Sequence, residues 1–178
     1  MIITEQERVV TNESIHVLFG LSGNAPGFLE EVQVALKSVL LNAPVATTHS
    51  SLTIHIMADD EAYQAISSLL VDDKSKMNVV KEWVSRNPIR IEIYNIQSHL
   101  QDWKERIQTG MHQFQFDQIT TSHTLGTYYR LFAHDVLPIH TVQHVLYMDS
   151  DAVLLANLQS IWAYRKDNTY FTWGREQS

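Results

Sequence analysis

Apolar residues along the chain follow two alternating periods. Mostly apolar runs, which are typical of buried strands, occupy residues 15–19, 52–58 and 144–148, and residues 89–94 alternate between apolar and polar side chains. Between the first two runs, the apolar positions of residues 28–40 recur every three or four residues, as on one face of an amphipathic helix. This order of strand, helix and strand predicts an α/β fold with a mostly parallel sheet flanked by helices.

Weaker patterns predict the remaining elements. Asp59 and Asp60 can cap a second helix, whose apolar positions fall within residues 62–69. The scattered Gln, His and Phe of residues 109–122 predict a mobile loop. The other expected elements are a helix over 77–84 that ends before Pro88, a helix over 125–136, a strand that ends at Asp149, a short helix near Asn157 and a strand over 170–173.

Composition narrows the function classes. The 178 residues have the size of one domain, and the net charge of −7, with Lys and Arg scattered along the chain, argues against nucleic acid or an anionic membrane as the main partner. No apolar stretch approaches the roughly 20 residues of a membrane span. The absence of cysteine excludes disulfides and thiolate metal sites. The histidines lack zinc-site spacing, so His16, His55 and His144 are expected to be packed, hydrogen-bonded residues of strands.

The strongest candidate for chemistry is the pair Asp149 and Asp151, with Ser150 between them, at the end of an apolar run. In open α/β sheets, ligands bind beyond the carboxyl ends of such strands. Two carboxylates at this spacing can face the same side and hold a hard divalent cation, Mg²⁺ or Mn²⁺, with phosphate oxygens on its open positions. The alternative is a turn that only ends a strand.

An ordered set of motifs surrounds this pair: the strand at 15–20, the Leu36-Lys37-Ser38 helix, the strand at 52–59, Thr127-Tyr-Tyr-Arg-Leu-Phe, Val136-Leu-Pro138, the Asp-Ser-Asp strand end, and Asn157 to Trp162. Their order resembles the retaining glycosyltransferases of family 8. Within the family, the Leu-Lys-Ser helix and Asp102-Trp-Lys104 are most similar to the xylosyltransferases that extend O-linked glucose. The resemblance implies the GT-A fold, which is Rossmann-like, and a single nucleotide-sugar-binding domain over residues 1–178.

That resemblance also implies site residues and partners. Asp149 and Asp151 would hold Mn²⁺ or Mg²⁺, a UDP-sugar would be the donor, and a glycan or glycoprotein would be the acceptor. The loop Phe19, Gly20, Ser22 and Asn24 would receive the nucleoside, although Ser22 stands where the family usually has Asp. Arg130, with Thr127 and Ser150 nearby, would contact the diphosphate or sugar, because a permanent charge among apolar neighbours needs a partner. No catalytic nucleophile can be named.

Other readings stay open from the sequence. The Gly-rich loop can be an ordinary turn, and Arg130 can be a surface residue whose stem packs on apolar neighbours. An apolar strand followed by Asp-x-Asp also matches haloacid-dehalogenase-type phosphohydrolases, in which the first Asp is a nucleophile. The resemblance to family 8 further implies that a third metal ligand, a histidine, and the acceptor wall lie beyond Ser178, which would leave a fragment that binds nucleotide without efficient transfer. A Golgi location is expected for a eukaryotic parent with an N-terminal anchor, and a cytoplasmic one otherwise.

Overall fold

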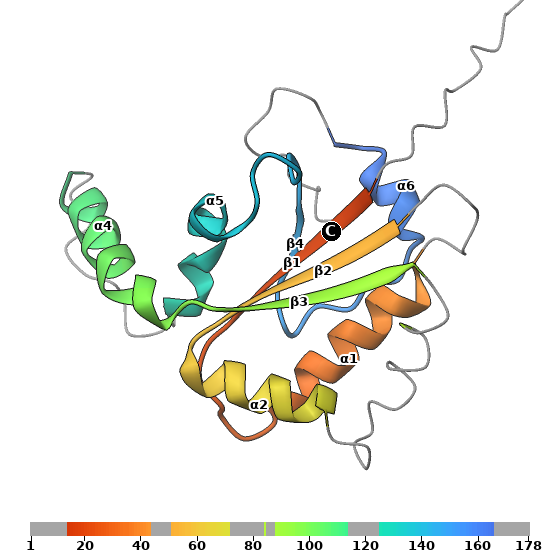
Figure 1. The fold of residues 1–178 in the computed structure, drawn as a ribbon, viewed down its shortest axis with the longest axis horizontal. Helices are drawn as coiled ribbons and strands as arrows, with labels where there is room; N and C mark the ends of the chain where they lie inside the picture. The colour runs from red at the N-terminus through yellow and green to blue at the C-terminus, as the bar shows by residue number, and fades with distance from the viewer. Residues whose placement is uncertain (1–13, 44–50, 72–83, 85–87, 114–124, 166–178) are drawn as a thin grey trace, which may run out of the picture.

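The computed structural model describes residues 14–43, 51–71, 84, 88–113 and 125–165 (Figure 1). Within these residues, one sheet of parallel strands has the order β3-β2-β1-β4. The strands are β1 (Ser14–Leu21), β2 (Ser51–Ala58), β3 (Ile89–Asn95) and β4 (Leu146–Met148). The sheet therefore has the parallel α/β architecture that the alternating periods predict.

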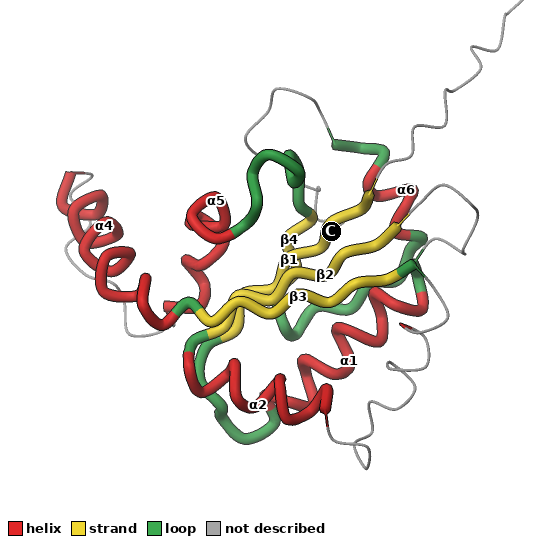
Figure 2. Tube along the Cα trace, in the orientation of Figure 1, coloured by secondary structure: helices red, strands yellow, loops and turns green. Residues whose placement is uncertain are grey.

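Helices lie on both sides of the sheet (Figure 2). Helices α1 (Phe28–Leu41) and α2 (Asp60–Val71) follow β1 and β2 and pack on one face. The other face is partly covered by elements that come later in the chain, namely η1 (Gln97–His99), α4 (Leu100–Gln113), the 3-10 helix η2 (Leu125–Phe132) and α5 (Ala133–Val136). The short helix α6 (Leu158–Trp162) joins the cluster on the α1 side.

Alternation along the strands divides the core into two clusters. Val17 and Phe19 of β1 point toward α1, whereas Leu18 points to the other face, where it joins Trp103 of α4 and Tyr129 of η2. All five of these side chains are at most 1% exposed. Because β1 is apolar on both faces, it reads as a continuous hydrophobic run and not as an alternating one.

Most of the predicted elements are confirmed. The strands at 15–19, 52–58 and 89–94 and the helix at 28–40 lie where their periods place them. Asp59 caps α2, since its Oδ1 accepts a hydrogen bond from the backbone N–H of Ala62 at 3.0 Å. Asn157 caps α6 in the same way, with Oδ1 accepting from Gln159 N at 2.9 Å. The predicted elements at 77–83 and 170–173 lie outside the described residues.

The loop predicted for residues 109–122 is wrong at its start, because α4 continues to Gln113. The helix buries Trp103 and Ile107, one turn apart, while most of its other described side chains are exposed. Because the buried face of α4 is so narrow, the segment has few apolar positions, and its helical periodicity is hard to recognise in the sequence. The remaining residues of that predicted loop, 114–122, lie outside the described part of the chain.

Two further expectations need correction. The segment expected to be an α-helix over 125–136 begins as the 3-10 helix η2, in which Gly126, Tyr129 and Phe132 are all buried. A spacing of three residues matches one turn of a 3-10 helix. The apolar run at 144–148 predicts a buried strand, but β4 covers only Leu146–Met148, lies at the sheet edge among the described strands and pairs over three residues with β1. His144 precedes this strand and is not part of it.

Candidate functional site

Asp149, Ser150 and Asp151 form a turn directly after β4. The backbone N–H of Ala152 donates to the carbonyl oxygen of Asp149 at 3.1 Å, which closes the turn. All three residues line a hollow of about 370 Å³. Met148 pairs with Phe19, so the turn sits beside the carboxyl end of β1. The two carboxylates therefore share one hollow at the end of the sheet where α/β proteins bind ligands.

Arg130 reaches the same hollow from η2. Its Nη2 lies 3.2 Å from Asp149 Oδ1, and its guanidinium carbon lies 4.2 Å from the centre of the Tyr147 ring. The Arg130 side chain is 27% exposed and that of Asp149 is 55% exposed, so solvent weakens this ion pair. Burial, followed by the nearby negative charge of Asp149, raises the pKa of the Tyr147 hydroxyl, which keeps it protonated. The hollow thus contains a guanidinium supported by a neutral aromatic ring.

Gly20 allows η2 to come close to β1. A Cβ atom at Gly20 would lie 3.2 Å from Tyr129 Cβ and 3.3 Å from the carbonyl oxygen of Gly126. Contacts this short with η2 would push that helix away from the sheet. The glycine therefore sets the distance between β1 and the element that carries Arg130.

The loop after β1 is held by the carboxylate of Asp59, which follows β2. Ser22 Oγ donates to Asp59 Oδ2 at 2.8 Å, and the backbone N–H of Gly23 donates to Oδ2 at 2.8 Å and to Oδ1 at 3.1 Å. Gly23 has a φ of 72°, in the left-handed region that favours glycine. These contacts fix Ser22 at the wall of the hollow.

The structure brings most of the predicted site residues together. Six of them line the hollow: Gly20, Ser22, Arg130, Asp149, Ser150 and Asp151. Phe19 does not line it, because its side chain is fully buried in the core beside α1. Asn24 is exposed in the loop and is not among the lining residues, and the side chain of Thr127 lies outside the described part of the structure.

Sequence reasoning missed four residues that line the hollow, namely Phe28, Glu31, Gly126 and Tyr147. Tyr147 could have been found, because it stands two residues before Asp149 and side chains at this spacing share a face of a strand. Phe28 and Glu31 belong to the first turn of α1 and reach the hollow only because that helix begins beside it. No local pattern marks them.

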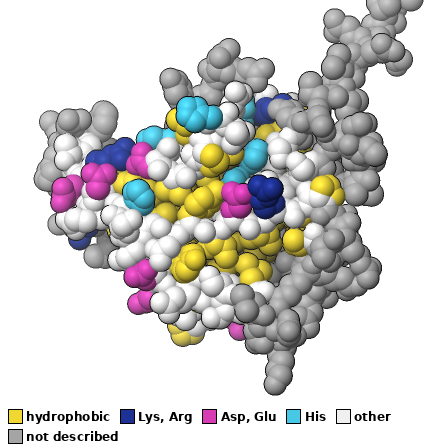
Figure 3. Space-filling model, viewed as in Figure 1, with side chains coloured by type: hydrophobic (Ala, Val, Ile, Leu, Met, Phe, Trp, Pro, Cys, Tyr) yellow, Lys and Arg dark blue, Asp and Glu magenta, His cyan; other side chains and the backbone are white. Residues whose placement is uncertain are grey.

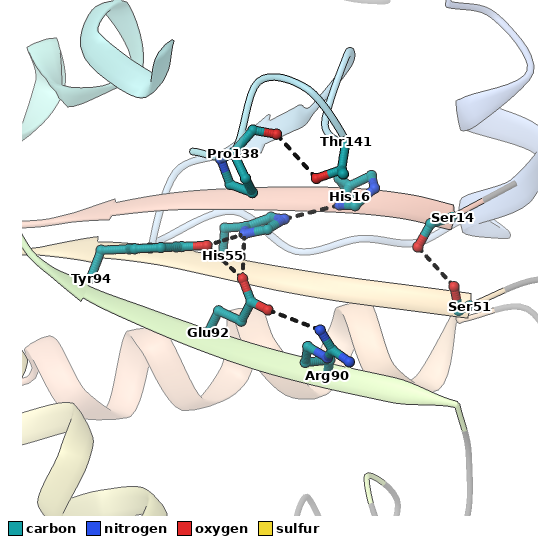
Figure 4. A network of polar contacts seen from close by, with 9 residues as sticks. All are labelled: Ser14, His16, Ser51, His55, Arg90, Glu92, Tyr94, Pro138 and Thr141. Atoms are coloured by element: carbon teal, nitrogen blue, oxygen red, sulfur yellow. Dashed lines mark hydrogen bonds and ion pairs between the residues drawn. The ribbon is translucent and has the colours of Figure 1, made fainter. Parts of the chain in front are cut away.

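A second hollow, of about 600 Å³, lies at the amino ends of β1, β2 and β3. His16, His55 and Glu92 line it and belong to a chain of polar contacts (Figure 4). His16 Nδ1 lies 2.9 Å from His55 Nε2, His55 Nδ1 lies 3.0 Å from the Tyr94 hydroxyl, and that hydroxyl donates to Glu92 Oε2 at 2.5 Å. Figure 3 shows histidine, acidic and basic side chains interrupting the hydrophobic surface on the face it views.

Tyr94 donates its only proton to Glu92, so its oxygen accepts from His55 Nδ1–H. Burial, followed by the charge of His16, lowers the pKa of His55 to about 4, which keeps the His55 ring neutral at pH 7. His55 Nε2 therefore carries no proton and accepts from His16 Nδ1–H. The expectation that His16 and His55 are packed, hydrogen-bonded residues is confirmed.

The described residues offer a limited set of metal ligands. Among them, no group of three or more His, Asp or Glu side chains is placed to hold a metal ion. Asp149, Asp151 and Glu31 are the carboxylates that line the hollow at the ligand-binding end of the sheet, and the first two belong to one turn. Within the same residues, no helix has the length and apolar character needed to span a membrane.

Comparison with known proteins gives two findings. A model of the family described as glycosyl transferase family 8 matches residues 16–177. The crystal structure of mouse xyloside xylosyltransferase 1, in its apo form, superposes with a TM-score of 0.56 at 13% sequence identity, over 85% of this chain and 47% of the mouse chain. At this identity the likeness concerns the fold alone, and the chain spans about half the length of that protein. No curated protein matches the sequence significantly.

Proposed function

The chain belongs to glycosyl transferase family 8, and from this membership we propose that it transfers a sugar from a UDP-sugar to a hydroxyl group of a glycan or glycoprotein. The observation that carries the proposal is the shared hollow of Asp149, Asp151 and Arg130 at the carboxyl ends of β1 and β4. Carboxylates for a cation and a guanidinium for a phosphate are the groups that a nucleoside diphosphate needs.

A divalent metal, Mn²⁺ or Mg²⁺, fits the donor set of this hollow. Asp149 and Asp151 present hard carboxylate oxygens from one turn, and the 55% exposure of the Asp149 side chain leaves it accessible to an incoming ion. Such an ion would stabilise the negative charge that develops on the departing diphosphate. Phosphate oxygens and water would complete its coordination.

Arg130 would orient the diphosphate. Its guanidinium is already held by Asp149 and by the face of the Tyr147 ring, so few conformations remain for it to lose on binding. A planar guanidinium can donate two parallel hydrogen bonds to phosphate oxygens. Ser150, between the two carboxylates, offers a hydroxyl to the same ligand.

The reaction we propose breaks the bond between the anomeric carbon and the β-phosphate oxygen, and the electron pair leaves with UDP. The acceptor hydroxyl oxygen forms the new bond to the anomeric carbon, and its proton passes to the departing phosphate. If this single displacement retains the anomeric configuration, as we propose, the acceptor must approach from the face that UDP leaves. UDP-xylose is the first donor to test, because the mouse enzyme with a similar fold is named a xylosyltransferase.

The phosphohydrolase alternative loses its support, because the family match covers residues 16–177 and includes the Asp149 strand. The two chemistries also differ in a measurable way. A phosphohydrolase of that class would hydrolyse a generic phosphate monoester through an aspartyl-phosphate at Asp149, whereas a sugar transferase would not.

Calorimetric titration of UDP tests the proposed function. We expect the dissociation constant to be at least tenfold lower with Mn²⁺ than with EDTA, because the ion neutralises carboxylates and phosphates together. Asp149→Asn and Asp151→Asn should remove this difference. Asp102→Asn, which makes the same charge change on an exposed residue of α4, is the matched control and should keep it. Equal UDP affinity in Mn²⁺ and in EDTA would show that Asp149 and Asp151 do not hold a metal ion for UDP.

Transfer itself is tested with UDP-xylose, UDP-glucose and UDP-galactose as donors and a panel of glycoside acceptors, with release of UDP as the readout. We expect turnover with one donor to exceed hydrolysis without acceptor, and to be lost in Asp149→Asn. Turnover of a phosphate monoester that vanishes in Asp149→Asn would favour the phosphohydrolase.

A further inference from the structure

The carboxylate of Asp59 accepts hydrogen bonds from two separate elements of the fold. The loop after β1 contributes the Ser22 hydroxyl and the Gly23 N–H, and the first turn of α2 contributes the Ala62 N–H. The backbone of Asp59 adds a link between the neighbouring strands, because its N–H donates to the carbonyl oxygen of Leu21 at 3.4 Å. One side chain thus connects the end of β2 to the loop that forms a wall of the hollow.

These contacts determine what Ser22 can offer to a ligand. A serine hydroxyl has one proton and two lone pairs. The proton of Ser22 is donated to Asp59 Oδ2 at 2.8 Å, and Tyr129 donates its own hydroxyl proton toward Ser22 Oγ at 3.5 Å. Burial raises the pKa of Tyr129 to about 12, so that hydroxyl keeps its proton. Ser22 therefore faces the hollow as a hydrogen-bond acceptor.

We propose that Asp59 is a positioning residue of the nucleotide-sugar site. By binding the Ser22 hydroxyl and the Gly23 N–H, it fixes the loop after β1 and presents Ser22 Oγ as an acceptor, which favours a ligand group that donates a proton. The imino N–H of uracil is such a donor, whereas the corresponding ring nitrogen of cytosine is an acceptor. This inference rests on the proposed function for its ligand, but the effect of Asp59 on the loop does not.

Asp59→Asn is the informative substitution. An amide nitrogen carries protons where the carboxylate oxygen accepts them, so either orientation of Asn places an N–H against a backbone N–H of Gly23 or Ala62. When the amide nitrogen faces Ser22, it donates to Oγ and frees the serine proton for the ligand. Ser22 can then donate to the base.

The experiment compares UDP, CDP and N3-methyl-UDP binding, in Mn²⁺, to the full chain and its variants. We expect the full chain to bind UDP at least tenfold more tightly than CDP or N3-methyl-UDP. In Asp59→Asn the ratio of the affinity for UDP to the affinity for CDP should fall at least fivefold. Ser22→Ala leaves the Ala62 cap intact and should lower the same ratio. Asp60→Asn makes an identical charge change at the next residue, whose carboxylate instead accepts from Asn95, and should leave the ratio unchanged.

A change of ratio separates positioning from general destabilisation, because a loosened fold weakens all three nucleotides together. An unchanged UDP-to-CDP ratio in Asp59→Asn would overturn the proposal. Amide hydrogen exchange at Gly23, measured without nucleotide, provides a readout that does not need the proposed function. If the unmodified chain binds no nucleotide, the proposed function is wrong. The role of Asp59 in holding the loop is then supported only if the Gly23 amide exchanges faster in Asp59→Asn than in Asp60→Asn.

Discussion

Arg130 and Asp149 form an ion pair across the hollow, with Nη2 and Oδ1 3.2 Å apart, although the two residues belong to η2 and to the turn after β4. The pair places a positive charge beside one of the two carboxylates that would hold a metal. A cation that binds Asp149 must therefore compete with the guanidinium or displace it toward the phosphates. This competition predicts opposite effects of Arg130 on metal and on nucleotide.

Arg130→Ala should bind Mn²⁺ alone more tightly, by about threefold to tenfold, because a repelling charge next to Asp149 is removed. The same variant should bind UDP in the presence of Mn²⁺ at least tenfold more weakly, because a charge-assisted contact to phosphate is lost. Calorimetry and Mn²⁺ electron paramagnetic resonance measure the two affinities. Arg90→Ala is the control, since Arg90 is 74% exposed and lines the other hollow. A loss of both affinities in Arg130→Ala would contradict the competition.

The pair His16 and His55 predicts a pH dependence of stability. The pKa of His55 is lowered from 6.5 to about 4 in the folded protein, and that of His16 is also lowered, in both cases chiefly by burial. Below pH 6.5 these histidines bind protons in the unfolded chain but stay neutral in the folded one. The free energy of unfolding is therefore highest above about pH 6.5 and falls as the pH drops toward 4. For His55 the full loss corresponds to about 3 kcal/mol.

Urea unfolding between pH 7.5 and pH 4 measures this dependence. We expect His55→Gln to reduce the loss between these limits, because its side chain does not titrate, although the variant should be less stable at pH 7.5. His140→Gln changes an exposed histidine and should keep the slope of the unmodified chain. An identical slope in His55→Gln would show that other groups cause the dependence.

Sequence patterns predicted the parts of the site that local chemistry defines. Asp149 and Asp151 follow an apolar strand. Their position at the carboxyl end of a parallel strand can be predicted from the alternation of side chains along the strand and from the order of the elements. The βα loop with Gly20 and Ser22 could be found for the same reason. Phe19 is predicted for the site because it adjoins that loop, but the strand continues to Leu21 and the Phe19 side chain lies in the core.

The remaining site contacts depend on packing between elements that are distant in sequence. The ion pair of Arg130 with Asp149 follows from how η2 approaches β1, and that approach depends on Gly20. Ser22 and Asp59, which are joined by a hydrogen bond, lie 37 residues apart along the chain. Periodicity within a window of 10 to 20 residues does not report such contacts.

Gly20→Ala should disturb both stability and the site. The added methyl group would meet Tyr129 Cβ at 3.2 Å and the Gly126 carbonyl at 3.3 Å, and relief of this overpacking typically costs about 1–3 kcal/mol. Displacement of η2 would also move Arg130, so UDP affinity should fall. Gly110→Ala in α4 is a matched control with no neighbour within 4 Å of the added atom, and it should stabilise the chain by about 0.5–1 kcal/mol. Thermal unfolding of the two variants should move in opposite directions.

Ser38 ties the segment after the carboxylate turn to α1, which gives a role to the serine of the Leu-Lys-Ser motif. Its Oγ donates to the Ala35 carbonyl at 2.7 Å and accepts the backbone N–H of Leu154 at 2.9 Å, while Asn42 Nδ2 donates to the Leu154 carbonyl at 2.8 Å. The Ser38 side chain is buried, so Ser38→Ala leaves the Leu154 N–H without its acceptor. An unsatisfied buried donor costs about 1–3 kcal/mol.

We therefore expect Ser38→Ala to lower the free energy of unfolding by about 1–3 kcal/mol and to weaken Mn²⁺-dependent UDP binding, because Leu154 follows Asp151 by three residues and holds the turn in place. Ser160→Ala, on the exposed side of α6, should change neither quantity. Denaturant unfolding and calorimetry at one temperature measure both effects on the same samples. Lower stability with unchanged UDP affinity would mean that the turn keeps its shape without the Ser38 contact, and that only the fold depends on this serine.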